Sequence, residues 1–114
     1  MQDITDPYVK PERALEKIGG KWKMPILWRL SLKDAWRYSE LKRAFDPISH
    51  KMLSRQLREL EADGFIHREL YPVVPPKVEY SLTDTGRKAL PAVKALCTFY
   101  AEITNEDLHP STKR

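Results

Sequence analysis

The hydrophobic pattern of this chain changes at Gly64, and the change limits the folds that the chain can adopt. Upstream of that glycine, apolar residues recur at helical spacing; Leu53, Leu57 and Leu60 are an example. Downstream, Phe65–Leu70 and Val78–Leu82 alternate apolar and polar residues, which predicts two antiparallel strands. The intervening Tyr71–Lys77 segment holds three prolines and predicts a protruding loop rather than a central strand. We therefore expect a mainly α fold with a small β-hairpin.

Proline, glycine and hydroxyl residues divide the region before Gly64 into predicted helices. The first is Glu12–Ile18, which Gly19-Gly20 ends, and the second contains Pro25 in its first turn. The apolar residues of the second helix are expected to be buried: Ile26, Leu27, Leu30 and Leu32. A third helix, 40–45, is expected to have Ser39 as its N-cap and to end at Asp46-Pro47.

Two further hydroxyl residues are predicted to begin the remaining helices. Ser49 is expected to cap a helix that runs to Asp63, and Thr83 one that runs from residue 84 to about 106. Pro91 lies inside the last helix and predicts a break near Leu90. The resulting order is helix, helix, helix–turn–helix, strand, loop, strand, helix, and a three-helix unit followed by a β-hairpin is typical of a winged helix-turn-helix domain.

Length and composition exclude several classes of protein. A chain of 114 residues is the size of one domain, and it holds no apolar run long enough for a transmembrane helix. Its single cysteine excludes an internal disulfide framework. Residues 1–6 lack the pattern of a signal peptide, so we expect a cytoplasmic protein that associates with the nucleoid when it is bound to DNA.

The net charge of +4 is unevenly distributed along the chain. Residues 10–43 carry ten basic and four acidic side chains, whereas residues 44–78 and 79–114 each balance. An electropositive first half suits a polyanionic partner such as double-stranded DNA, although a solvated lysine-rich face would look the same.

Five ordered sequence blocks carry a family resemblance. They are Leu15–Trp22, Tyr38–Leu41, Ile48–Leu53, Leu57–Gly64 and Val74–Thr83. Together they resemble the HxlR-type transcriptional regulators, relatives of the MarR group, over about residues 10–100. The resemblance implies that 1–114 is a single winged helix-turn-helix domain with a core at 10–83 and a dimerisation helix at 84–106. It also implies a bacterial homodimer that regulates transcription at a pseudo-palindromic operator.

The 49–63 helix would then be the DNA-reading helix. Its apolar side is opposite Lys51, Arg55 and Arg58, with Ser54 on the flank. Arg55 could contact guanine bidentately, Lys51 and Arg58 more readily meet phosphates, and Ser54 suits either. The candidate DNA-binding residues also include two at the start of the helix and two expected to flank the hairpin loop: Ser49, His50, Arg68 and Lys77.

Other readings of the sequence stay open at this stage. A winged helix can bind protein instead of DNA, and acidic residues of the 49–63 helix would suit that alternative. An enzyme is disfavoured because no nucleophile–base set, metal-ligand spacing or cofactor loop is evident, and we expect no cofactor. The three tryptophans are expected in the core rather than around a ligand, although a small-molecule effector stays open as a partner.

The cysteine pattern differs from that of thiol-sensing relatives. Many members of the family that this chain resembles carry Cys-Pro shortly before the first helix, and in some of them that cysteine senses oxidants or electrophiles; this chain has Val9 and Lys10 there. We expect Cys97 to be a small buried hydrophobe on an apolar terminal helix, with a redox role as the alternative.

Overall fold

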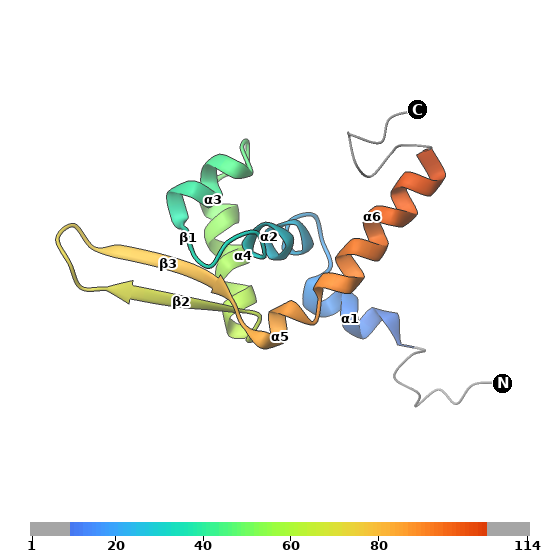
Figure 1. Ribbon diagram of the computed structural model, residues 1–114, viewed down its shortest axis with the longest axis horizontal. Coiled ribbons are helices and arrows are strands. Elements are labelled where there is room, and N and C mark those ends of the chain that lie inside the picture. Colours follow the sequence, from blue (N-terminus) through green and yellow to red (C-terminus); the bar gives the residue numbers. More distant parts are fainter. Residues whose placement is uncertain (1–9, 105–114) are drawn as a thin grey trace.

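The computed structural model describes residues 10–104, which form six helices and a three-stranded sheet (Figure 1). The helices and strands follow one another in the order expected of a winged helix-turn-helix domain. The predicted fold class, mainly α with a small β-hairpin, is confirmed. Along the chain they are α1 (Pro11–Ile18), α2 (Lys23–Leu30), β1 (Trp36–Arg37), α3 (Tyr38–Ala44), α4 (His50–Ala62), β2 (Ile66–Tyr71), β3 (Lys77–Leu82), α5 (Asp84–Arg87) and α6 (Leu90–Thr104).

The core forms where α2, α3 and α4 meet. Each of these helices places one apolar stripe against the other two, and a fully buried leucine contributes about 1.5–3 kcal/mol relative to an exposed one. The side chains with essentially no exposed surface are Ile26, Leu27 and Leu30 of α2, Leu41 of α3, and Leu53, Leu57 and Leu60 of α4.

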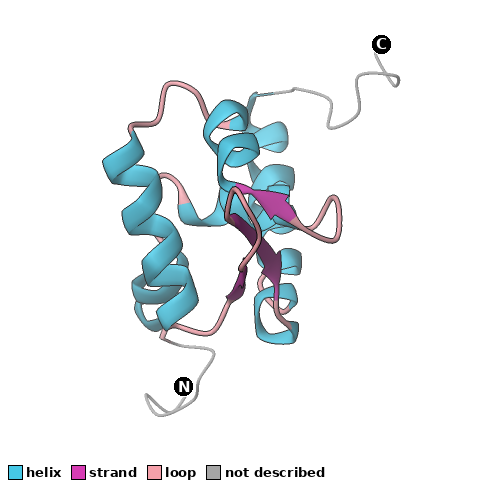
Figure 2. Cartoon of the chain, turned by 90° about the vertical axis from the view of Figure 1, so that its left-hand side faces the viewer, coloured by secondary structure: helices cyan, strands magenta, loops and turns pink. Residues whose placement is uncertain are grey.

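Strands β2 and β3 form the predicted hairpin, and we call residues 66–82 the wing. Their antiparallel register pairs Ile66 with Leu82 at one end and Tyr71 with Lys77 beside the loop. The wing extends away from the helices in Figure 1, and Figure 2 views it from its tip, with helices on either side of the foreshortened strands. Ile66, Tyr80 and Leu82 are the buried residues of the wing, and the residues nearer the loop are half-buried or exposed, so the loop end is free to contact another molecule.

Thr83 connects the sheet to the terminal helices. Its hydroxyl donates to the carbonyl of Gly64 at 2.6 Å and accepts from the amide of Gly86 at 3.0 Å. The predicted break in the terminal helix near Leu90 is confirmed, because α5 ends at Arg87 and α6 begins at Leu90, one residue before Pro91. The expected helix end at residue 106 lies outside the described residues.

The start of α3 differs from the prediction. The helix begins at Tyr38, so Ser39 lies inside it and is not its N-cap. The amide of Arg37 instead donates to the Glu40 carboxylate at 2.9 Å, which satisfies one of the free amides of the first turn. Trp36 and Arg37 form β1, an unpredicted strand that pairs with β3 and gives the order β1-β3-β2.

Several predicted core residues are at the surface. Leu32 is 60% exposed because α2 already ends at Leu30, and Trp28 is 40% exposed. Trp22 and Trp36 do pack against the core as predicted.

Helix α6 is apolar but largely uncovered in the single chain. Val93 is buried, and α6 packs against α2. Cys97 is exposed, so the expectation of a buried thiol is wrong for the single chain. Four large side chains are each more than half exposed: Leu96, Phe99, Tyr100 and Ile103. None of the helices within residues 10–104 is long and apolar enough to span a membrane.

Gly86→Ala tests the junction between the sheet and the terminal helices. A Cβ at this position would overlap the backbone carbonyl of Phe65, which cannot move as a side chain could. We expect a loss of about 1–3 kcal/mol in the free energy of unfolding, measured by urea denaturation. Thr85→Ala, in the same short helix but exposed, is the control, and equal stability of the two variants would contradict the close packing.

Candidate nucleic-acid interface

Helix α4 is held by its apolar stripe and its N-cap, and this determines which side chains point outward. The Ser49 hydroxyl accepts from the amide of Met52 at 3.0 Å, which confirms the predicted cap. With the leucine stripe in the core, the cationic side chains Lys51, Arg55 and Arg58 are exposed and Ser54 is half-buried. We call these four residues the recognition face.

Tyr38 links the two helices of the helix-turn-helix. Its hydroxyl lies 3.0 Å from Nδ1 of His50 and 3.3 Å from Oγ of Ser54, and its ring stacks on the imidazole. The first residue of α3 therefore sets the position of the N-terminal turn of α4. The sequence reading included Tyr38 in a family block but assigned it no role.

A hollow of about 410 Å³ lies between α4 and the base of the wing. Arg58 of α4 and Arg68 of β2 both line it, so arginines from two different elements share one concave surface. Arg68 pairs with Tyr80 in the middle of the hairpin, and the expectation that it flanks the loop is wrong. The remaining lining residues are Tyr38, Ser54, Leu57, Glu61 and Tyr80.

Two cations that the sequence reading did not select lie beside the start of α4. Lys42 and Arg43, together with His50, line a second hollow of about 550 Å³ between α3 and α4. The signal that could have found them is the excess of basic residues in 10–43.

Lys77 lies at the loop end of the wing, as predicted. Its ammonium is 4.5 Å from the centre of the Tyr71 ring and 3.8 Å from Oε2 of Glu79. These contacts hold the cation against the hairpin.

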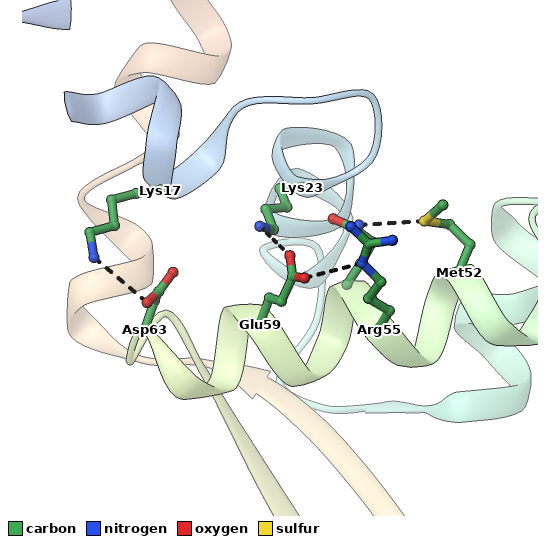
Figure 3. Close-up of polar contacts among 7 residues, drawn as sticks. Lys17, Lys23, Met52, Arg55, Glu59 and Asp63 are labelled. Carbon is green, nitrogen blue, oxygen red and sulfur yellow. Dashed lines mark hydrogen bonds and ion pairs between the residues drawn. The ribbon is translucent and has the colours of Figure 1, made fainter. Parts of the chain in front are cut away.

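Arg55 is tied to the protein scaffold by an acidic residue. Its Nε donates to Oε2 of Glu59 at 3.2 Å, and Oε1 of the same carboxylate accepts from Nζ of Lys23 at 2.6 Å (Figure 3). Hydrogen bonds from Lys23 first, and from Arg55 second, hold the pKa of Glu59 below 4.5. The carboxylate is thus ionised at neutral pH and connects α2 to the recognition face.

These features define a class of protein. An exposed cationic helix face, presented by a helix-turn-helix and flanked by a β-hairpin, is the arrangement of winged helix-turn-helix DNA-binding proteins. Within residues 10–104 there is no group of three His, Cys, Asp or Glu side chains that could hold a metal ion.

Sequence comparison identifies the family. Residues 17–108 match the HxlR-like helix-turn-helix family, and the chain belongs to it. It is therefore an HTH-type transcriptional regulator and not an enzyme. The chain is 54% identical over 86 residues to the regulator YdzF of Bacillus subtilis strain 168, covering 75% of this chain and 79% of YdzF. It is also 54% identical over 92 residues to the regulator BH0655 of Halalkalibacterium halodurans, covering 81% of each.

Solved structures agree with this assignment. The transcriptional regulator YtcD matches with a TM-score of 0.79 and 49% identity, over 83% of this chain and 96% of YtcD. A MarR-family regulator from Enterococcus faecalis V583 matches with a TM-score of 0.77 and 36% identity, over 92% and 94% of the two chains. The oxidised redox regulator HypR matches with a TM-score of 0.74 and 45% identity, over 86% and 98%. The predicted resemblance to HxlR-type and MarR-related regulators is confirmed, while the expectation about Val9 concerns a position outside the described residues.

Tyr38→Phe tests the link between α3 and α4. The variant keeps the ring but removes the hydroxyl that contacts His50 and Ser54, so we expect a loss of about 0.5–1.5 kcal/mol in stability. Hydrogen exchange should quicken in the first turn of α4. Tyr71→Phe, which removes an exposed tyrosine hydroxyl from the wing, is the control. Unchanged exchange in Tyr38→Phe would contradict the assigned role.

Proposed function

We propose that this chain binds DNA sequence-specifically as a homodimer and regulates transcription at a pseudo-palindromic operator. The observation that carries the proposal is that an arginine of the recognition face and an arginine of the wing line the same hollow. Arg58 and Arg68 line that hollow together, although they are ten residues apart and lie on different elements. A convex helix beside a concave cationic surface suits a major groove and its adjacent phosphates.

The proposed roles follow from exposure and position. Lys51 and Arg58, on the outer side of α4, would neutralise phosphates, and Arg68 would extend that contact toward the wing. Arg55 would read a base, because a guanidinium can donate two parallel hydrogen bonds to guanine. The flanking contacts would come from the start of α4 and from the hairpin: Ser49, His50, Ser54 and Lys77.

The dimer would form through the terminal helix. In this proposal residues 10–83 are the DNA-binding core and 84–106 the dimerisation segment. The apolar side chains of α6 from Leu96 to Ile103 are too extensive an exposed surface for a small domain on its own. A second copy of α6 would cover them and would present two recognition helices to one face of the DNA.

The DNA-binding proposal is tested by selection from a random duplex library, followed by titration in increasing salt. If a dimer neutralises on the order of 6–10 phosphates, log affinity should fall with log salt at about −0.9 per contact. A matched scrambled duplex is the control for sequence preference. Failure to enrich any duplex, with binding to a protein instead, would favour the alternative of a protein-interaction module.

Ile103→Glu tests the dimer. A carboxylate in an apolar interface is costly to bury, so sedimentation should show monomers and DNA affinity should fall. Thr85→Glu adds the same charge on exposed α5 and should leave the dimer intact. The half-sites selected by the wild type should lie about 34–36 Å apart or at a multiple. An unchanged dimer in Ile103→Glu would move the interface away from α6.

A further inference from the structure

A continuous chain of charged contacts runs from α2 to the recognition face. The two oxygens of the Glu59 carboxylate have different partners, Lys23 on α2 and Arg55 one turn earlier on α4 (Figure 3). One oxygen therefore contacts Lys23 of α2, and the other contacts Arg55 of the recognition face. Arg55 is 60% exposed, so its position depends on this contact more than on packing.

Lys23, at the α2 end of these charged contacts, is held firmly in place. The Lys23 side chain is only 12% exposed, and α2 continues from it into the fully buried Ile26 and Leu27. Lys23 begins a helix, where a positive charge meets the positive end of the helix dipole, and the Glu59 carboxylate offsets that repulsion. The carboxylate is thus held from behind by a nearly buried cation.

The contact also selects which donors of Arg55 stay available. A guanidinium has five N–H donors in a planar fork, and Glu59 engages the one on Nε. The four donors on the two terminal nitrogens are left for a ligand, and they form the edge that can contact guanine bidentately. An arginine held in one orientation before binding loses less conformational entropy when it meets a base.

We propose that Glu59 and Lys23 are positioning residues for sequence reading: without touching DNA, they orient Arg55 toward a single base pair. This inference rests on the proposed DNA-binding function. Since the carboxylate also repels phosphates, it disfavours use of Arg55 as a simple backbone contact. Sequence preference, more than total affinity, is the property that depends on these two residues.

The same helix offers a matched control. Asp63 pairs with Lys17 of α1 at 3.7 Å, again joining α4 to an earlier helix, but no arginine of the recognition face takes part (Figure 3). Asp63→Asn and Glu59→Gln change the net charge equally. Any effect of charge on DNA affinity in general should therefore appear in both variants.

The experiment compares wild type, Glu59→Gln and Asp63→Asn on the duplex that the wild type enriches from a random library. Each single base-pair substitution of that duplex is titrated at fixed salt. We expect Glu59→Gln to lose about fivefold or more of its discrimination at one base pair, the same pair at which Arg55→Ala loses discrimination. Asp63→Asn should keep the wild-type preference at every position.

Two further measurements keep the test decisive. Thermal unfolding establishes that each variant is folded, and Lys23→Met, which keeps the apolar stem, should lose discrimination at the same base pair but to a smaller extent. Equal gains of affinity for all duplexes in Glu59→Gln and Asp63→Asn, with every preference kept, would overturn the positioning role. A wild type that enriches no sequence would instead overturn the proposed function itself.

Discussion

The burial of one leucine stripe on α4 is the constraint on which the rest of the structure depends. Leu53, Leu57 and Leu60 are at most 2% exposed, and replacing any one of them by alanine would cost about 2–5 kcal/mol. Because a helix is rigid, fixing this stripe also fixes the opposite side, where Lys51 and Arg55 lie. The core of the domain therefore determines which side of α4 carries the cations, and the Glu59 contact then positions the exposed Arg55 side chain.

Local signals predicted most of the secondary structure. The Ser49 and Thr83 caps and the break before Pro91 each depend on residues within a few positions of one another, and each strand of the hairpin has its own local alternation, so the sequence contains the information. Alternation also predicted the strands to within a residue at each end. Helix existence and order, and with them the winged helix-turn-helix class, follow from such short-range patterns.

The errors at β1 and at Arg68 concern contacts between distant residues, whereas the error at Ser39 concerns a local one. Strand β1 has only two residues and exists because β3 pairs with it, so no local periodicity could indicate it. The predicted Ser39 cap was wrong because the Glu40 carboxylate accepts from the amide of Arg37, three residues earlier, and the helix begins at Tyr38, two residues before the predicted start. The proximity of Arg68 to Arg58 depends on hairpin register and on how β2 packs against α4, which a single sequence does not specify.

Helix α2 connects the two surfaces on which the function is proposed to depend. It packs against α6, which carries the exposed apolar side chains. Its first residue, Lys23, forms an ion pair with Glu59 of α4. A tightly packed helix moves as a unit, so a shift of α6 in an assembly would be transmitted to α2 before it reaches α4. The ammonium of Lys23 would then move relative to the carboxylate that holds Arg55. Helix α2 thus contacts both the helix that is proposed to form the dimer and, through Lys23 and Glu59, the arginine that is proposed to read a base.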